Sequence, residues 1–331
     1  MVENSKFLLE VSNLKKYYNI KSGLFSSKNK IAKSVNDVSF NIQRGRIMGL
    51  VGESGCGKST VGKTILRLSE ATGGKVTFDD KIVFDVENKI KLSNREMCNL
   101  RKDMQIIFQD PYASLNPRKN IGSIIEEGMR KHKLGSMKEI HEQCEEILNL
   151  CGMDKNDFQR YPHEFSGGQR QRIGIARALA VKPKFLVCDE PTAALDVSIQ
   201  SQILNLMLDF KEEFSLTYLF ISHNLNVVRY FCDDICVMYL GKIVETGPAK
   251  ELYENPLHPY TKALISSIPI SNPMEKRERI ILKGTIPGAT DIPSGCAFHT
   301  RCKYASEICK KSVPILKNIN EKCTVACHLY K

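Results

Sequence analysis

The sequence predicts an α/β fold with a mainly parallel sheet, on three observations. Short apolar runs alternate with segments of helical periodicity from residue 46 to about residue 240. A glycine-rich loop at residues 52–59 (GESGCGKS) follows one apolar run and opens a helical pattern. Another apolar run, residues 184–188, ends in the acidic residues Asp189 and Glu190. Strands that alternate with helices favour a parallel sheet that is covered on both faces.

The apolar patterns place the expected elements along the chain. Strands are expected at residues 7–12, 38–42, 46–51, 76–78, 104–108, 184–188, 216–222, 235–240 and 242–245, with a basic loop between the first two. Helices are expected at residues 58–68, 120–151 with a break near Gly135, 166–181, 198–210 and 225–231. Prolines and cysteines accumulate after Asn255, so we expect a domain at residues 1–270 and an extension at residues 271–331. The sequence has no internal repeat, which indicates a single nucleotide-binding domain.

Composition restricts the class of protein. The 331 residues include 42% hydrophobic residues but no apolar run long enough to span a bilayer. The first ten residues lack a signal-peptide core, so secretion is not expected. The net charge of +11 fits solubility, a polyphosphate ligand, nucleic acid or an anionic membrane face. The basic stretch at residues 21–33 has a single aromatic residue, Phe25, and lacks the aromatic interleaving of a single-strand binding groove, so nucleic acid is not an expected partner.

The glycine-rich loop has the spacing of a site for nucleotide phosphates. Glycines let successive backbone N–H groups turn toward a phosphate, and the following helix presents its positive end. Lys58 is expected to reach the β- and γ-phosphates, and Ser59 to offer its hydroxyl to Mg²⁺. The residues expected to bind the nucleotide here are Gly52, Glu53, Ser54, Gly55, Cys56, Gly57, Lys58, Ser59 and Thr60.

Two further motifs add chemistry to this loop. Asp189, at the carboxyl end of its strand, is expected to hold Mg²⁺, and Glu190 to orient and deprotonate an attacking water. Residues 166–169 (SGGQ) open a helix, where Ser166 is an N-cap and the exposed N–H groups form a second anion site. A simple kinase or GTPase needs only one such helix end.

These motifs together resemble the ATPase domains of ABC transporters, over about residues 7–250. Residues 166–169 match the signature motif, Gln109 the Q-loop, Asp196 the D-loop and His223 the switch histidine. The resemblance implies a P-loop NTPase of the ABC type, with a helical subdomain at about residues 110–165 that contacts membrane subunits. Tyr18 fits the aromatic residue that stacks on adenine better than Tyr17 does.

The same resemblance implies roles for the matched residues. Two such domains pair head to tail, so Ser166, Gly167, Gly168 and Gln169 would serve ATP bound mainly to the partner chain. His223 would contact the γ-phosphate and act with Glu190. Gln109 would sense the γ-phosphate and join Ser59 and Asp189 at the Mg²⁺. Asn224 follows the histidine where many relatives carry aspartate, so hydrolysis is expected but identical dimer contacts are not.

Three further segments look like the ATPase subunits of oligopeptide/dipeptide importers, and the second of their two unlike ATPases in particular. They are residues 160–164 (RYPHE), residues 255–261 (NPLHPYT) and the tail from GCAFHTRC at residues 295–302 to VACH at residues 325–328. This likeness implies a heterodimer with a second ATPase, two transmembrane permease subunits, an extracytoplasmic substrate-binding protein and a peripheral place on the cytoplasmic face of the membrane. It makes the chain an ATP hydrolase that energises peptide import.

Other functions stay open at this point. Nickel or metal-chelate importers share the architecture of peptide importers. A soluble ABC protein that acts on nucleic acid or the ribosome would carry two fused ATPase domains or a long coiled-coil insert, and the sequence has neither. A scaffold with inactive ATP sites is disfavoured, because Lys58, Asp189, Glu190 and His223 are all present.

Cysteine is concentrated at the end of the chain. Five of the 12 cysteines fall in the last 36 residues. Four thiolates, from Cys296, Cys302, Cys309 and Cys327, could hold a [4Fe-4S] cluster or Zn²⁺. The spacing lacks the Cys-x2-Cys pairs of zinc ribbons, which favours the cluster, and Cys323 is an alternative ligand. Reduced structural cysteines are the remaining interpretation.

Overall fold

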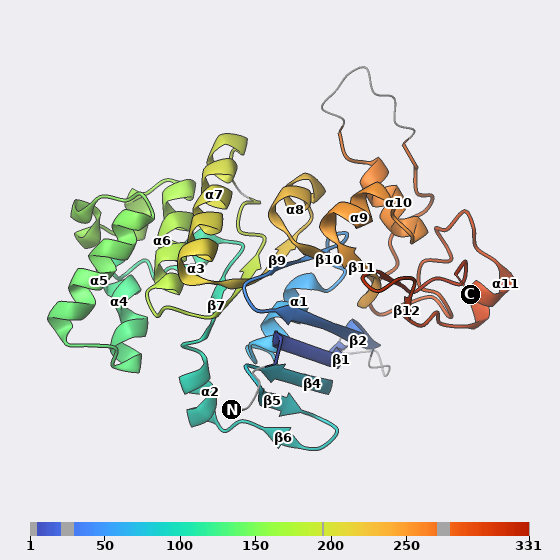
Figure 1. Cartoon of the computed structure of the whole chain (residues 1–331), viewed down its shortest axis with the longest axis horizontal. Coiled ribbons are helices and arrows are strands. Elements are labelled where there is room, and N and C mark those ends of the chain that lie inside the picture. The colour runs from blue at the N-terminus through green and yellow to red at the C-terminus, as the bar shows by residue number, and fades with distance from the viewer. Residues whose placement is uncertain (1–4, 21–29, 194, 270–278, 331) are drawn as a thin grey trace, which may run out of the picture. The chain divides into compact units, whose positions relative to one another are not determined.

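The computed structural model describes residues 5–20, 30–193, 195–269 and 279–330. The chain divides into two compact units, one formed by residues 1–91 and 221–331 and the other by residues 92–220 (Figure 1). No helix within the described ranges is long and apolar enough to cross a membrane. The boundary expected near residue 270 stays a prediction, since residues 270–278 fall outside those ranges.

The first unit begins with an antiparallel sheet that the sequence patterns did not predict. The order is β2-β1-β4-β5-β6, and β1 pairs antiparallel with β2 and β4. The bounds are β1 Phe7–Ile20, β2 Lys30–Gln43, β4 Gly73–Phe78, β5 Lys81–Asp85 and β6 Ile90–Lys91. The basic loop expected between β1 and β2 is therefore wrong for residues 13–20 and 30–37, and its central residues 21–29 are outside the described residues.

The predicted parallel pairing is confirmed in this unit by β3 (Ile47–Val51) and β10 (Asp234–Tyr239). All five residues of β3 are buried, which is typical of a strand covered on both faces. The strand order is β12-β13-β11-β10-β3. The remaining elements are α1 Lys58–Ile65, α8 Leu225–Phe231, β11 Lys242–Pro248, α9 Ala249–Glu254, α10 Pro259–Ser266, α11 Glu307–Lys311, β12 Lys317–Asn318 and β13 Thr324–Val325.

The C-terminal residues continue this sheet and share its core. β13 pairs with β11, and the hydroxyls of Thr246 and Thr324 lie 2.8 Å apart across that pair. Phe298 is buried against Tyr239 and Tyr260, with ring centroids 5.2 and 5.4 Å away. The segment after residue 279 therefore packs with residues 221–269 as one hydrophobic core.

The second unit holds β7 (Met104–Ile107), β8 (Phe185–Asp189) and β9 (Thr217–Ser222), of which β9 belongs here as far as Phe220. The order is β9-β8-β7, and β7 runs parallel to β8, as predicted. The other elements are α2 Asn94–Leu100, α3 Pro111–Ser114, α4 Ile121–His132, α5 Met137–Leu150, two 3-10 turns at Lys155–Gln159 and Pro162–Glu164, α6 Gly167–Leu179 and α7 Val197–Phe214. Figure 1 shows α4, α5 and α6 side by side.

The helix predicted at residues 120–151 is two helices that meet near Gly135, as the sequence indicated. Asn120 caps α4, and Ser136 caps α5 through a capping box, so each helix has its own start signal. Glu126 of α4 is only 3% exposed, and it is paired with Arg130 and with His141 Nδ1 at 3.0 Å. Pairing compensates the cost of burying that carboxylate.

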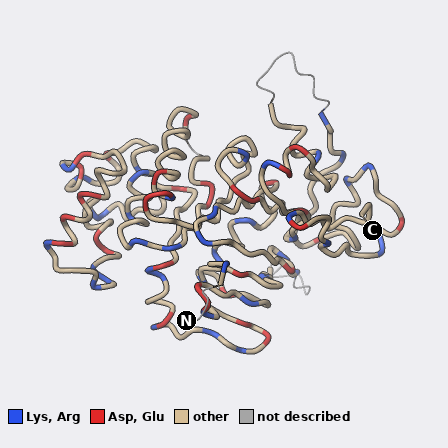
Figure 2. The backbone as a smooth tube through the Cα atoms, viewed as in Figure 1, with Lys and Arg blue, Asp and Glu red and all other residues tan. Residues whose placement is uncertain are grey.

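Charged residues of both signs are interspersed along each unit (Figure 2). In α4 and α5 they form ion pairs such as Lys119–Glu127 at 2.9 Å and Lys138–Glu142 at 3.8 Å. Exposed pairs of this kind contribute little to stability, so packing of the apolar faces holds these helices.

Two helical glycines provide a matched test of this packing. A Cβ on Gly122 would lie 1.9 Å from the buried ring of Phe158, whereas a Cβ on Gly174 of α6 would meet nothing within 4 Å. We expect Gly122→Ala to lower the free energy of unfolding by about 1–3 kcal/mol because of overpacking. Gly174→Ala should raise it by about 1 kcal/mol, because alanine is the better helix former. Urea denaturation of both variants tests this, and equal shifts of the same sign would contradict the packing of α4 described here.

Candidate functional site

The loop at residues 52–59 connects β3 to α1, as its sequence predicts. Gly57 is the N-cap of α1 and has φ +108°, which L-residues rarely adopt. A Cβ on Gly57 would lie 2.0 Å from the carbonyl oxygen of Ser34, and one on Gly52 would lie 2.2 Å from that of Met238. The loop is therefore a cradle of backbone with no room for side chains at those two positions.

Lys58 already occupies this cradle. Its ammonium is buried and donates to the carbonyl oxygens of Gly52 at 2.8 Å and Glu53 at 3.1 Å. Cys56 is a buried residue of the loop, and its burial raises the pKa of the thiol above the usual range. Cys56 is consequently a neutral packing residue.

Glu53 makes contacts that the sequence patterns did not reveal. Its carboxylate accepts two hydrogen bonds from the Arg301 guanidinium, at 2.8 and 3.2 Å. Its backbone N–H donates to the Tyr260 hydroxyl at 2.9 Å. The segments that carry Tyr260 and Arg301 match family motifs, but no local pattern connects them to a residue more than 200 positions earlier.

Tyr18 lies on β1 of the same unit, and its ring is 40% exposed. The Lys16 ammonium lies 4.7 Å from the ring centroid. Both hydroxyls have hydrogen-bond partners: Tyr18 with Ser69 Oγ at 3.3 Å, and Tyr17, which donates to Asn36 Oδ1 at 2.7 Å. Tyr18 is exposed and Tyr17 only half-buried, so Tyr18 suits the stacking role expected of it better than Tyr17 does.

His223 follows β9 directly and is exposed. The next residue, Asn224, is the N-cap of α8, and its side-chain oxygen accepts from Asn226 N at 3.1 Å. Asparagine and aspartate cap helices about equally well, so asparagine in place of the aspartate of many relatives preserves the N-cap of α8.

In the second unit, the strand β8 brings Asp189 and Glu190 to its carboxyl end. Asp189 is 3% exposed. Glu190 has φ +47°, an uncommon conformation for a residue with a side chain, and such conformations cluster at functional sites. Gln109 follows β7, and its Nε2 donates to Glu190 Oε2 at 3.2 Å. Two residues 81 positions apart thus meet because β7 and β8 are neighbours.

Ser166 caps α6, as expected. Its Oγ accepts from Gln169 N at 3.3 Å, while Gln169 Oε1 accepts from Ser166 N at 2.9 Å. Ser166 and Gly167 are exposed, and a Cβ on Gly168 would lie 2.7 Å from Ile199. Asp196 precedes α7 as its N-cap, and residue 194 of this turn is outside the described residues.

The predicted residues thus form two sets. The loop at residues 52–59, Tyr18 and His223 belong to the first unit. Gln109, residues 166–169, the two acids of β8 and Asp196 belong to the second. Within its own unit, the structure joins Gln109 to Glu190 and supports the loop with Arg301 and Tyr260.

The prediction of a [4Fe-4S] cluster on Cys296, Cys302, Cys309 and Cys327 is wrong. In the described part of the chain, no group of three or more His, Cys, Asp or Glu side chains could hold a metal ion, which also removes the zinc alternative. Burial raises the pKa of Cys296 to about 11 and also raises the pKa values of Cys302 and Cys327.

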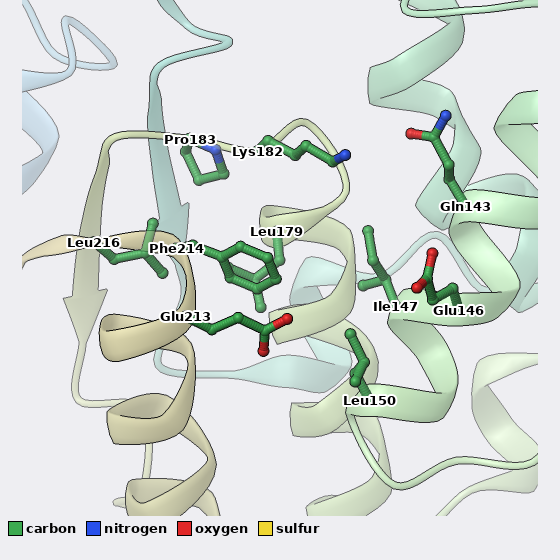
Figure 3. Close-up of a pocket in the computed structure, with 10 residues that line it drawn as sticks. All are labelled: Gln143, Glu146, Ile147, Leu150, Leu179, Lys182, Pro183, Glu213, Phe214 and Leu216. Carbon is green, nitrogen blue, oxygen red and sulfur yellow. The ribbon is translucent and has the colours of Figure 1, made fainter.

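A pocket of about 220 Å³ lies in the second unit, and no residue of the predicted site lines it (Figure 3). Its walls come from α5, the end of α6 and the end of α7, and they include Ile147, Leu179 and Phe214. Glu146 and Lys182 add charge to it. No motif or apolar pattern in the sequence predicts this pocket.

Comparison with known proteins places these features in a family. Residues 35–193 match the ABC transporter family, and residues 244–309 match the oligopeptide/dipeptide transporter C-terminal region. The oligopeptide transport ATP-binding protein AppF of Bacillus subtilis is 51% identical over 99% of this chain and 98% of its own length. The di/tripeptide transport ATP-binding protein DppF of Pseudomonas aeruginosa is 45% identical over 97% of each chain.

Solved structures agree with this assignment. A dimeric ATP-binding cassette bound to ADP and Pi in a post-hydrolysis state is 28% identical, with a TM-score of 0.63 over 73% of this chain and 98% of that one. The cbiO1 protein of Clostridium perfringens, part of an ABC transporter complex, has the same identity and TM-score over 76% of this chain and 92% of that one. The fold predicted from the sequence is thus confirmed, and the chain belongs to the ATP-hydrolysing subunits of ABC transporters, in the oligopeptide/dipeptide transporter family.

Proposed function

We propose that this chain hydrolyses ATP to energise the import of oligopeptides or dipeptides through a membrane ABC transporter. One observation carries the proposal: similarity to peptide transport ATP-binding proteins extends over nearly the whole chain and includes the C-terminal region. The ATPase fold alone would not select a cargo, because many functions share one fold.

The loop at residues 52–59 fits a nucleotide triphosphate. At Gly52 and Gly57 neighbouring backbone lies where a side chain would have to be, so the loop itself is formed mainly by backbone. The ammonium of Lys58 brings a positive charge into the loop. Backbone N–H groups at a helix start bind phosphate well. We assign residues 52–60 to phosphate binding and the exposed ring of Tyr18 to adenine stacking.

We assign the hydrolytic roles as the resemblance to ABC ATPases implies. Ser59, Gln109 and Asp189 would hold Mg²⁺, which when bound offsets the charge of the β- and γ-phosphates. Glu190 would accept the proton of the attacking water, and its hydrogen bond from Gln109 orients the carboxylate for that step. His223 would contact the γ-phosphate.

The second anion site serves a partner chain in this proposal. Ser166 and Gly167 are exposed at the start of α6, so another subunit can approach them. We propose a head-to-tail heterodimer in which residues 166–169 and Asp196 close over ATP bound to a second ATPase. Two permease subunits and an extracytoplasmic binding protein complete the transporter, and the chain lies peripherally on the cytoplasmic face of the membrane.

Lys58→Ala should weaken ATP binding by about 10- to 100-fold, since charged hydrogen bonds to phosphate are lost. Isothermal titration calorimetry with ATP and Mg²⁺ measures this. Lys63→Ala, at an exposed position of the same helix, is the control and should bind like the wild type. Equal affinities of wild type and Lys58→Ala would remove the loop from the site.

Glu190→Gln should reduce ATP turnover by about 10²- to 10⁴-fold while ATP binding persists, because the amide cannot take the proton of water. Phosphate release by the assembled transporter gives the rate. The exposed Glu212→Gln on α7 is the matched control. Turnover near the wild-type value in Glu190→Gln would exclude Glu190 as the base.

The cargo is tested in cells that lack this chain. We expect them to lose growth on oligopeptides that supply a required amino acid, and wild-type protein but not Glu190→Gln should restore it. Uptake of radioactive nickel, measured in the same strains, should not change. Lost nickel uptake with normal peptide use would instead favour the metal importer.

A further inference from the structure

Every polar group of Glu53 has a partner, and the partners of its N–H and its carboxylate come from the C-terminal part of the first unit. The N–H donates to the Tyr260 hydroxyl at 2.9 Å, and the carbonyl oxygen accepts from Lys58 at 3.1 Å. The carboxylate accepts from Arg301 at 2.8 and 3.2 Å. The second residue of the phosphate loop is therefore held mainly by residues that are distant in sequence.

The contact with Arg301 is a bidentate ion pair in a protected position. The side chain of Arg301 is 7% exposed and that of Glu53 is 22% exposed. Two parallel bonds fix the plane of the carboxylate as well as its distance, which a lysine could not do. Such a pair is geometrically demanding, so something must hold the arginine itself in place.

An aromatic cluster holds the arginine. The backbone N–H of Arg301 donates to the carbonyl oxygen of Phe298 at 3.0 Å. Phe298 is 2% exposed and packs against the rings of Tyr239 and Tyr260. Tyr260, which accepts from Glu53 N, thus also packs against the turn that carries Arg301. The phosphate loop and these C-terminal residues are therefore packed together.

Charge gives this contact a consequence for the ligand. ATP brings several negative charges to a loop whose second residue is a glutamate. An unpaired carboxylate in this partly buried place would repel the phosphates, because the effective dielectric constant there is well below that of water. The guanidinium cancels that charge.

We propose that Arg301 is a positioning residue of the ATP site, which neutralises Glu53 and holds it within the C-terminal part of the unit so that the phosphate loop can accept a triphosphate. The inference rests on the proposed function of residues 52–59 as the ATP-binding loop. It makes the segment around Arg301 a determinant of ATP affinity in addition to any role in assembly.

The test measures ATP affinity in the Glu190→Gln background, where turnover is suppressed. Isothermal titration calorimetry with ATP and Mg²⁺ is applied to Arg301→Met, Glu53→Gln and the double variant. Arg279→Met is the matched control, because Arg279 is exposed and lines the same cavity of about 570 Å³ as Glu53 and Arg301. Near-UV circular dichroism checks that each variant is folded.

The variants should differ in magnitude. Arg301→Met should weaken ATP binding by about tenfold or more, because it leaves a charged carboxylate unpaired. Glu53→Gln should weaken ATP binding much less than Arg301→Met does, because it leaves no unpaired carboxylate beside the phosphates. The double variant should return to within about threefold of the background, since the two sites are coupled. Arg279→Met should not change the affinity.

Two results would overturn the inference. One is weakening in Glu53→Gln as large as in Arg301→Met, which would make the pair a structural contact only. The other is unchanged affinity in Arg301→Met. If Arg301→Met does not fold, the double variant decides: weak ATP binding by the folded double variant rejects charge neutralisation. Lys58→Ala in the same assay separates this from a failure of the site itself, because it must weaken binding if residues 52–59 hold ATP.

Discussion

The site in the first unit depends on a steric constraint: backbone must pass against backbone at both ends of the phosphate loop. Gly52 lies against the carbonyl of Met238, and Gly57 against that of Ser34. Any side chain at either position would displace β10 or β2. The loop is also bonded to the turn after β10, where Gly241 N donates to Cys56 O at 2.9 Å, and the same turn accepts from Asn36 N of β2 at 2.8 Å. The shape of the loop is therefore a property of its neighbouring strands.

The same reasoning applies to the C-terminal residues. They contribute two strands to the sheet of the first unit, an aromatic ring to its core and a charge to the phosphate loop. Lys33 N even donates to Ala289 O at 3.0 Å, which ties β2 to this segment. The sequence predicts an extension for this region, but its described residues pack around the phosphate loop.

The second unit solves a different problem, the orientation of a carboxylate. Parallel neighbours β7 and β8 end at one edge of their sheet, so Gln109 can donate to Glu190. Glu190 itself has left-handed backbone, and in the turn after β8 its carbonyl oxygen accepts from Ala193 N at 3.2 Å. A left-handed conformation costs free energy at a residue with a side chain, and the surrounding structure must offset that cost.

The sequence by itself determined the parts of the protein that are local. Glycine spacing, apolar periodicity and capping residues specify the phosphate loop, β3, β8 and the start of α6, because each depends on residues within a few positions. It misjudged the long strands β1 and β2, whose polar residues lack a clear alternation and are held by cross-strand pairing. The sequence also wrongly predicted that four cysteines bind a metal cluster, because spacing along the chain does not determine the geometry or burial of the thiols. Only the tertiary structure decided that Gln109 meets Glu190 and that Arg301 meets Glu53. Contacts over 81 and 248 residues arise from strand order and core packing, which no short motif encodes.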